Sequence, residues 1–272
     1  MKRICIITGG LGNQMFEYAY VMALRERGIE VILDISYYDF FKMHNGYELG
    51  RVFGIKEDTV SSQGVHMLWL RLLNRFRPSS LYTYDDLQFN GDALINPKKY
   101  IFGYWLDEKY FTSISSQVRK IFQFEGIDGY NLQLAEQMHN IESVSLHVRR
   151  GDYSEFGINL VGEEYYQKAI NRIKEMLSNP VYYIFSDDVE VAENIAKKLN
   201  IEYVMVTHNQ NQDSYKDMYL MSQCKHNIIA NSSFSWWGAW LGNNVNKITI
   251  APKTWLESSP DFKPQLDNWI LL

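Results

Sequence analysis

The chain has few of the residues that mark disulfide-rich, zinc-binding or nucleic-acid-binding proteins. Only two of its 272 residues are cysteines, Cys5 and Cys224, and they lie far apart, which argues against a disulfide framework or a zinc site. Basic residues number 27 and acidic residues 32, so the net charge is -5 and no broad positive field attracts a polyanion. We therefore expect no nucleic-acid partner.

Long apolar runs are also missing. No window approaches the roughly 18 consecutive apolar residues that a spanning helix needs. The apolar run at the start is short and passes into a glycine turn, so it predicts a first strand. Because no spanning segment is found, we expect a soluble, cytoplasmic protein. Residues 65–77 mix Trp69 with arginines at a loose helical period, which favours a half-buried helix, with a membrane-surface helix as the alternative.

The apolar residues that are present alternate between strand-like and helix-like patterns. Residues 3–8 and 29–33 predict strands on either side of a helix over 15–27. The second half repeats this plan, with strands expected at 144–148, 181–185, 203–206, 227–230 and 248–251, and helices at 163–177, 189–199, 213–223 and 233–241. Uniformly apolar strands that alternate with helices predict parallel sheets covered on both faces.

A chain of 272 residues can bury one large core or two modest ones, since domains usually run to about 100–200 residues, and we expect two domains. Residues 37–125 are aromatic and weakly periodic, and a glycine turn precedes the second half, so we place an N-terminal α/β domain at 1–130 and a C-terminal one at 131–272. Ligands in such sheets bind beyond the carboxyl ends of the strands, where polar motifs are expected.

The segment HVRRGDY, residues 147–153, begins in a strand and ends in a glycine turn. Since successive strand residues face opposite ways, we expect Arg149 to point into a site and Arg150 to anchor the turn, for example on Asp152. A guanidinium group matches a phosphate bidentately. Two solvated arginines at a strand end remain the alternative.

A strand, a serine-rich turn and an aromatic helix follow each other over residues 228–241. Ser232, Ser233 and Ser235 are predicted at the helix N-terminus, where free N–H groups receive anions. Plain N-capping is the alternative for the serines. The tryptophans of this helix are expected in the core.

The segment GGLGNQ, residues 9–14, joins the first strand to its helix and resembles a dinucleotide-binding loop, with Asp34 placed like a ribose-binding acid. Met15 stands where the third glycine belongs, so the prediction of an NAD site is weak. The alternatives are a structural turn, or a loop in which Gly10 and Gly12 approach a ligand and Asn13 offers its amide.

Two acids complete the candidate residues. Asp217, on a predicted helix, could accept both N–H groups of a guanine edge. Asp187 closes the strand 181–185 at a position that faces a site in α/β sheets, although an N-cap explains an aspartate there equally well.

With GGLGNQ, HVRRGDY and NSSFSWWGAWL in this order and spacing, the chain resembles the family 11 glycosyltransferases, the α-1,2-fucosyltransferases, over nearly its whole length. The resemblance implies the GT-B type of fold, two Rossmann-like domains facing across a cleft, with GDP-β-L-fucose held by the C-terminal half and the acceptor on the N-terminal side. Relatives often carry glutamine at the position of Leu106, which puts acceptor preference in doubt.

The resemblance also implies roles for single residues. Arg149 matches the arginine on the β-phosphate, and His147 and Asp152 its catalytic neighbours. Asp217 matches the guanine-reading acid. The other positions expected to bind substrate are Asn13, Gly10, Gly12, Arg150, Asp187, Ser232, Ser233, Ser235, Tyr104 and Trp105.

The implied reaction is inverting transfer of fucose to the 2-hydroxyl of a galactose. An Asp-x-Asp triplet, the usual metal-holding pair on a sugar diphosphate, is absent, so we expect no metal and no other cofactor. The general base stays open among Asp34, Asp39, His44, Asp107, Asp152 and Glu163. The acceptor glycan is also open, and a lipid-linked one would bring peripheral membrane contact. Another nucleotide sugar, an NAD-dependent reductase or a sugar-binding protein without activity are the rival functions.

Overall fold

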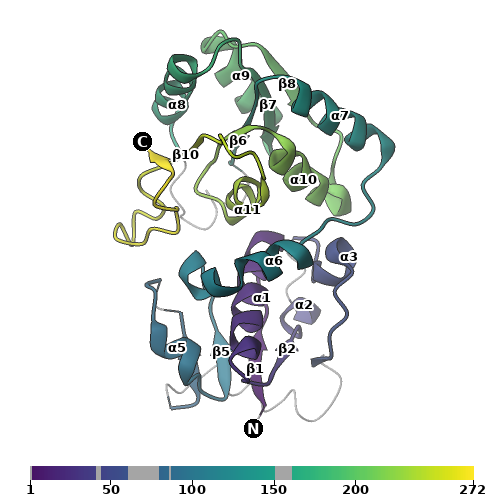
Figure 1. Cartoon of the computed structure of the whole chain (residues 1–272), viewed down its shortest axis with the longest axis vertical. Coiled ribbons are helices and arrows are strands. Elements are labelled where there is room, and N and C mark those ends of the chain that lie inside the picture. Colours follow the sequence, from purple (N-terminus) through teal and green to yellow (C-terminus); the bar gives the residue numbers. More distant parts are fainter. Residues whose placement is uncertain (1, 41–43, 61–79, 86, 151–160) are drawn as a thin grey trace. The chain divides into compact units, whose positions relative to one another are not determined.

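The computed structural model describes residues 2–40, 44–60, 80–85, 87–150 and 161–272. The chain divides into two compact units, Met1–Glu125 and Gly126–Leu272 (Figure 1). We call them unit 1 and unit 2. Each unit has its own sheet, and each is described separately below.

Unit 1 contains a parallel five-stranded sheet in the order β3-β2-β1-β5-β4. Its strands are β1 (Arg3–Ile6), β2 (Val31–Asp34), β3 (Thr59–Val60), β4 (Tyr82–Tyr84) and β5 (Tyr100–Phe102). Its helices are α1 (Leu11–Glu26), α2 (Tyr37–Phe40), α3 (Leu49–Phe53), α5 (Gly91–Ile95), η1 (Glu108–Tyr110), η2 (Thr112–Ile114) and α6 (Ser115–Ile121). The predicted β1-α1-β2 opening is confirmed.

The helix α1 is buried along most of its length, since it lies against the sheet and is also covered by aromatic side chains. Met15, Tyr20 and Leu24 are fully buried. Met15 therefore fills core volume where a dinucleotide-binding loop would have glycine. Several of the described aromatic residues between 80 and 125, a region that the sequence pattern left without a structure, pack against α1 and the sheet. Tyr20 of α1 stacks on Trp105 with ring centroids 4.1 Å apart, and Tyr82 stacks on Tyr100 at 5.0 Å.

Unit 2 contains a parallel six-stranded sheet in the order β11-β10-β9-β6-β7-β8. Its strands are β6 (Ser143–Val148), β7 (Val181–Ser186), β8 (Tyr203–Val206), β9 (His226–Ile228), β10 (Thr249–Ala251) and β11 (Ile270–Leu271). Its helices are α7 (Gly129–Asn140), α8 (Glu163–Met176), α9 (Val189–Lys198), η3 (Asn211–Asp213), α10 (Tyr215–Gln223) and α11 (Ser233–Leu241).

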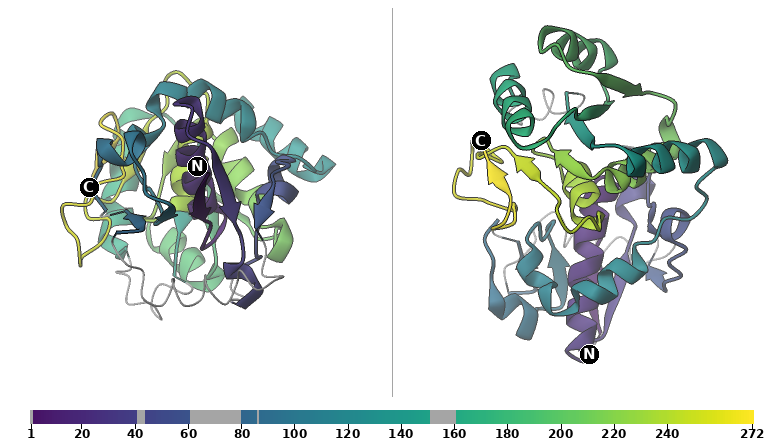
Figure 2. Two further views of the ribbon diagram at one scale, coloured as in Figure 1. Left: turned by 90° about the horizontal axis from the view of Figure 1, so that it is seen from below. Right: turned by 45° about the horizontal axis from the view of Figure 1, so that its top comes forward.

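Helices cover both faces of the unit 2 sheet (Figures 1 and 2). On one face, Val144, Leu146 and Val148 of β6 pack in a cluster with residues of α8 and α9. On the other face, Tyr183 and Phe185 of β7 pack with residues of α7 and α10. The α/β class predicted from alternating apolar strands and helices is confirmed.

Some sequence expectations can be compared directly with the described residues. Cys5 and Cys224 are buried and free, and they belong to different units. Among the helices described, none is long and apolar enough to cross a membrane. The helix expected over 65–77 lies outside the described residues.

Candidate active site

The first candidate group lies where β6 ends in unit 2. His147 belongs to the opposite face of β6 from Val148, because strand side chains alternate, and its ring lies 6.1 Å from that of Phe234. Arg149 follows directly after the strand. Its guanidinium group pairs with the Asp187 carboxylate, Nη1 to Oδ2, at 2.8 Å, and both side chains are about one-quarter exposed (26% and 25%). A partly exposed cation thus stands at the carboxyl edge of the sheet.

Asp187 binds the end of β6 at two points. Its Oδ2 pairs with Arg149, and its Oδ1 accepts a hydrogen bond of 2.8 Å from the Arg150 backbone N–H. The neighbouring Ser186 hydroxyl donates to the Val148 carbonyl at 2.7 Å. The strands β6 and β7 pair up to Val148 and Ser186, so the Ser186 hydroxyl reinforces the last pair and Asp187 continues the contact beyond it. In this state Asp187 holds the arginine, which makes it a positioning group for the site.

Burial lowers the pKa of His147 to about 3, with a further contribution from the positive charge of Arg149. The imidazole is therefore neutral at ordinary pH and a weak base. Its Nδ1 has no hydrogen-bond partner among the residues described and is buried. A neutral ring with an unused nitrogen is suited to bind a polar ligand group, more than to remove a proton.

The serine turn leaves the same edge of the sheet as Arg149. Leu146 of β6 lies opposite Ile228 of β9, so both chains emerge from neighbouring strands. Ser232 is the N-cap of α11 in extended backbone conformation, and its side chain makes no capping hydrogen bond. Ser233 is the first helical residue. The N–H groups of this helix start and the Arg149 cation thus lie after neighbouring strands at one edge of the sheet, where we expect an anion to bind.

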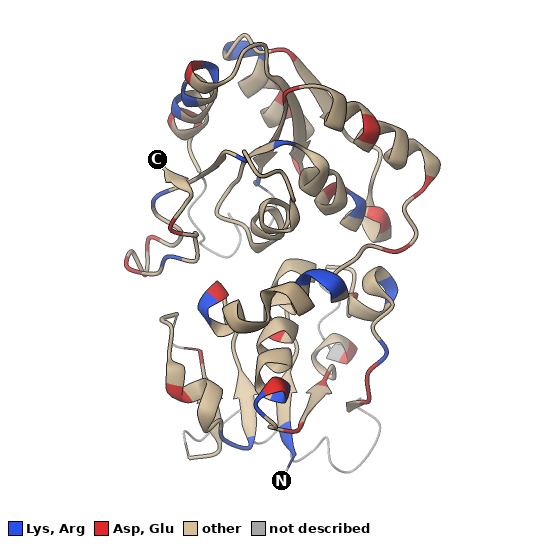
Figure 3. Cartoon of the chain, viewed as in Figure 1, with Lys and Arg blue, Asp and Glu red and all other residues tan. Residues whose placement is uncertain are grey.

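Ser235 was predicted at the same helix N-terminus, and it lies in the first turn of α11, but its surroundings do not support contact with a ligand. Its side chain is 1% exposed and its hydroxyl donates to the Ser232 carbonyl at 3.3 Å, inside the helix. The three tryptophans of α11 are in the core as expected, each at most 2% exposed. The helix carries no charged residue, whereas α8 displays mixed charges (Figure 3).

Asp217 lies in the first turn of α10 and is half-buried. Its Oδ1 accepts a hydrogen bond of 2.8 Å from Asn209 Nδ2. Burial raises the pKa of the carboxyl group to about 7, and the hydrogen bond from Asn209 acts in the opposite direction. The Asp217 carboxyl group is thus oriented by Asn209, and with a pKa of about 7 it gains or loses its proton near neutral pH.

In unit 1, the glycine turn precedes α1. Gly9 has a left-handed φ of +72°, and a Cβ there would lie 2.7 Å from Asn13 Nδ2 and 3.3 Å from Tyr104 Cε1. Gly10 is the N-cap of α1 without a side-chain cap, and Gly12 is buried inside the helix. Asn13 and the Tyr104 ring therefore lie over the turn. Tyr104 is 39% exposed, which leaves its ring available to a sugar.

The prediction that Trp105 binds substrate is corrected. Its side chain is fully buried and stacks on Tyr20 with ring centroids 4.1 Å apart. The residue has a φ of +56°, and its backbone N–H donates to Asp85 Oδ2 at 2.7 Å. This local geometry turns the indole into the core while the adjacent Tyr104 stays at the surface.

A buried acid beside the glycine turn was missed by the sequence reasoning. Glu17 is 0% exposed and accepts hydrogen bonds from both the backbone N–H and the hydroxyl of Thr8, all between 3.0 and 3.2 Å. Burial raises the pKa of Glu17 well above its ordinary value. The available signal was a charged residue inside the apolar stretch 15–24. Glu17 holds the end of β1, from which the turn starts.

Asp34 does not serve as a ribose-binding acid in this structure. It is 0% exposed, and its Oδ1 accepts the Ser36 backbone N–H at 2.9 Å. This burial removes a main support of the NAD-site prediction. Asp152 lies outside the described residues, so its predicted role stays a prediction. Within the described ranges, no group of three or more His, Cys, Asp or Glu could hold a metal ion.

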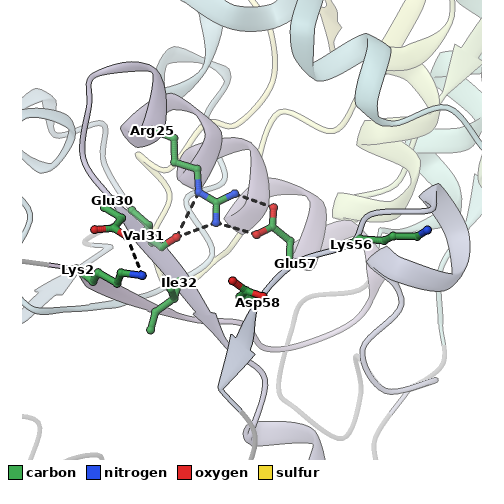
Figure 4. A pocket seen from close by; sticks show the side chains of 8 residues that line it. All are labelled: Lys2, Arg25, Glu30, Val31, Ile32, Lys56, Glu57 and Asp58. Carbon is green, nitrogen blue, oxygen red and sulfur yellow. Dashed lines mark hydrogen bonds and ion pairs between the residues drawn. The ribbon is translucent and has the colours of Figure 1, made fainter.

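A polar pocket elsewhere in unit 1 is lined by Lys2, Arg25, Glu30, Val31, Ile32, Lys56, Glu57 and Asp58 (Figure 4). It lies at the start of β2, opposite the carboxyl edge where sheets of this kind bind ligands. Its arginine is engaged by the Glu57 carboxylate, at 2.7 and 2.9 Å, and by the Val31 carbonyl. We assign this pocket a structural role.

Known glycosyltransferases are similar to this chain in sequence and in fold. The chain is 34% identical to an α-1,2-colitosyltransferase of Escherichia coli, over 97% of this chain and 96% of the relative. It is 33% identical to the O-antigen biosynthesis glycosyltransferase WbnK of the same species, over 98% and 99%. The mouse galactoside α-(1,2)-fucosyltransferase 2 is 32% identical over 44% of this chain and 35% of the relative.

Among solved structures, the fucosyltransferase NodZ from Bradyrhizobium matches with a TM-score of 0.52 at 14% identity, covering 88% of this chain and 92% of NodZ. A family 9 glycosyl transferase from Veillonella parvula matches with a TM-score of 0.51 at 11% identity, over 100% and 86%. These likenesses confirm the GT-B type of α/β fold. The model of glycosyl transferase family 11 matches residues 4–272, and the chain belongs to that family.

Proposed function

We propose that the protein is an inverting glycosyltransferase that moves L-fucose from GDP-β-L-fucose to the 2-hydroxyl of a galactose residue, forming an α-1,2 linkage. The observation that carries this proposal is the position of Arg149. It provides a cation at the carboxyl edge of the unit 2 sheet, directly after the strand next to the one that leads into α11. A diphosphate needs both a cation and N–H donors.

In the proposed complex, the β-phosphate replaces Asp187 as a partner of the Arg149 guanidinium group. Ser232, Ser233 and the first N–H groups of α11 bind the remaining phosphate oxygens. The His147 ring, which is neutral because of its low pKa, offers a nitrogen to the nucleotide. Asp217 accepts the N–H groups of the guanine edge. These roles are the ones that the family resemblance implies, and they are supported by the carboxyl edge of the sheet that His147, Arg149 and the serine turn share.

In the reaction, the bond between fucose C1 and the β-phosphate oxygen breaks, and its electron pair leaves with GDP. The acceptor 2-oxygen bonds to C1 from the opposite face, which inverts β to α, and the hydroxyl proton is released. Arg149 stabilises the charge that gathers on GDP. Three candidate bases already make structural contacts: Asp34 in the core, Asp107 as cap of η1, and Glu163 paired with Lys198. We assign no general base.

We also propose that the reaction needs no metal ion. The argument comes from the sequence, which lacks the Asp-x-Asp carboxylate pair. The negative charge of the leaving group is then neutralised by the arginine and by the amides of the helix terminus.

The acceptor proposed is a galactose-terminated glycan bound on the unit 1 side, over the glycine turn and Tyr104. A relative involved by name in O-antigen biosynthesis favours a lipid-linked precursor among the possible acceptors. Such a precursor would bring the protein to the cytoplasmic face of a membrane as a peripheral enzyme.

A second donor, GDP-colitose, is favoured by the 34% identical relative, which is named a colitosyltransferase. Colitose is L-fucose without its 3-hydroxyl group. The same phosphate and guanine contacts would bind both donors, and only groups near the sugar 3-position would separate them. The two candidates therefore share the proposed mechanism.

The test is incubation of the purified protein with GDP-fucose, GDP-colitose or a UDP-sugar, each with a panel of galactose-terminated acceptors. We expect consumption of GDP-fucose and an α-1,2 linkage in the product by NMR. Consumption of GDP-colitose but not of GDP-fucose would show that GDP-colitose is the donor. Turnover of UDP-sugars without turnover of any GDP-sugar would contradict the proposed guanine site.

A further inference from the structure

Behind Asp217 lies a buried pair of amide side chains, Asn131 and Asn209. They are 1% and 8% exposed, and they come from the first helical turn of α7 and from the loop after β8. Each donates to the other: Asn131 Nδ2 to Asn209 Oδ1 at 3.0 Å, and Asn209 Nδ2 to Asn131 Oδ1 at 2.9 Å. The same Asn209 Nδ2 donates to Asp217 Oδ1 at 2.8 Å.

The orientation of this pair is fixed from its outer side by Asp128. The Asp128 carboxylate caps α7 by accepting the Asn131 backbone N–H at 3.0 Å, and it also accepts from Asn131 Nδ2 at 2.9 Å. The hydrogen bond from the Asn131 backbone and the ion pair with Lys216 hold the pKa of Asp128 far below its usual range. Because this carboxylate can only accept, Asn131 must turn its NH2 group toward it.

This constraint passes from one amide to the next. Because the NH2 group of Asn131 donates to Asp128, the amide oxygen of Asn131 faces Asn209. Asn209 must therefore turn its own NH2 group toward this oxygen to donate a hydrogen bond. The second N–H of that group then points at Asp217. His208 Nε2 also contacts Asn131 Oδ1, at 3.0 Å. A fixed hydrogen-bond chain thus runs from the α7 cap to the Asp217 carboxyl group.

The charged groups around this chain come from three elements. Asp128 is the N-cap of α7, His208 follows β8, and Lys216 on α10 pairs with both Asp128 and Asp213, at 2.9 and 2.8 Å. Burial lowers the pKa of His208, so this ring adds little charge. Among the described residues, the hydrogen bond that the structure shows to the Asp217 side chain comes from Asn209.

We propose that Asn209, oriented by Asn131, is a positioning residue that sets the base specificity of the nucleotide site by aiming the Asp217 carboxyl group at the two N–H donors of guanine. This proposal rests on the proposed function, since it assumes that a guanine nucleotide binds in unit 2. A carboxylate accepts both donors, whereas a protonated carboxylic acid presents a donor of its own toward them. The hydrogen bond from Asn209 favours the form that guanine needs.

A pH dependence follows from this chemistry. Burial brings the pKa of free Asp217 to about 7, and binding of guanine favours the ionised form. Below that pKa the site must release a proton to bind, so GDP affinity falls as the pH falls, approaching tenfold per pH unit. Loss of the Asn209 donor raises the pKa of Asp217 further, so the fall begins at a higher pH.

The experiment is calorimetric titration of GDP and inosine diphosphate (IDP) into wild type and Asn209→Leu between pH 5.5 and 8.5. IDP lacks the 2-amino group and offers one N–H donor fewer. We expect Asn209→Leu to weaken GDP binding at pH 7 about tenfold or more. It should also reduce the preference for GDP over IDP and move the acid limb of the profile to higher pH.

Two variants complete the design. Asn171→Leu, on the exposed side of α8, is the matched control and should retain the affinity and pH profile of the wild type. Should the leucine variant fail to fold, Asn209→Ser is used instead. We expect the same changes in GDP affinity, selectivity and pH profile, each of smaller magnitude. Wild-type affinity, selectivity and pH profile in a folded Asn209 variant would overturn this inference. UDP is titrated into the wild type as well, and tighter binding of UDP than of GDP would instead overturn the proposed function.

Discussion

The turn after β1 in unit 1 and the turn after β9 in unit 2 share one plan, since each joins a parallel strand to the N-terminus of a helix. Their surroundings differ. The first is flanked by the buried acids Glu17 and Asp34, and the second by the guanidinium group of Arg149. A helix N-terminus alone attracts anions. The difference teaches that a neighbouring cation, and not the helix start alone, distinguishes the two turns, and the proposed diphosphate site is therefore the turn beside Arg149 in unit 2.

Removal of the Arg149 cation, which distinguishes the unit 2 turn from the unit 1 turn, should have the largest effect on activity. Arg149→Ala should lower turnover roughly a hundredfold or more, because electrostatic stabilisation of a leaving group is typically worth about 3–4 kcal/mol. Steady-state kinetics with GDP-fucose measures the effect. Arg172→Ala, which removes an exposed arginine paired with Glu175, is the control and should leave turnover unchanged. Wild-type turnover in Arg149→Ala would remove the arginine from the mechanism.

The serine turn should show a smaller effect. Ser232→Ala should weaken GDP binding about tenfold, as expected for one hydrogen bond to a charged group. Because the Ser232 side chain makes no capping bond, the melting temperature should stay close to that of the wild type. Ser235→Ala is the matched control, since that hydroxyl bonds within the helix. Equal losses of GDP affinity in both variants would argue against a ligand role for Ser232.

The turn in unit 1 should respond to the acceptor and not to the nucleotide. Tyr104→Ala should raise the acceptor KM roughly two- to tenfold, the usual worth of an aromatic contact, with unchanged GDP affinity. Phe89→Ala tests an aromatic residue of similar exposure, 43%, in the same unit, and should leave the KM unaltered. If GDP affinity fell instead of acceptor KM, the assignment of the two turns would be reversed.

The buried acid of unit 1 should affect stability. The folded chain holds the Glu17 proton to higher pH than the unfolded chain does. Its stabilising contribution is therefore complete below the unfolded pKa of about 4.3 and is lost as pH rises through the folded pKa. Glu17→Gln cannot ionise, so its melting temperature should fall less between pH 5 and 8, by about 2–4 °C for each kcal/mol involved. Identical pH slopes for both proteins would show that Glu17 stays ionised when folded.

The smallest effect expected is that of a chelator. EDTA should change the rate less than about twofold, because the cation of the unit 2 turn is an arginine. An assay before and after EDTA treatment measures this. A loss of activity that manganese restores would contradict metal independence.

The sequence predicted unit 2 well because its strands are apolar along their whole length and alternate with helices of clear period. The start of α11 at Ser233 and the strand that carries His147 were both placed correctly. In unit 1, short strands such as β4 and β5 were missed, since three residues give no measurable period.

Side-chain environments were predicted less well than elements. Trp105 was expected to bind substrate, but its left-handed backbone and the hydrogen bond to Asp85 place it in the core. The pair Asn131 and Asn209 was missed because 78 positions separate the two residues, and no local pattern reports such a contact. Only the fold brings these amides behind Asp217.

The most direct test of the central claim is a crystal structure of the protein with GDP bound. The account predicts that the Arg149 guanidinium group lies within hydrogen-bonding distance of a diphosphate oxygen and that its 2.8 Å pair with Asp187 is broken or lengthened. An Arg149 still paired with Asp187 and remote from the diphosphate would contradict it.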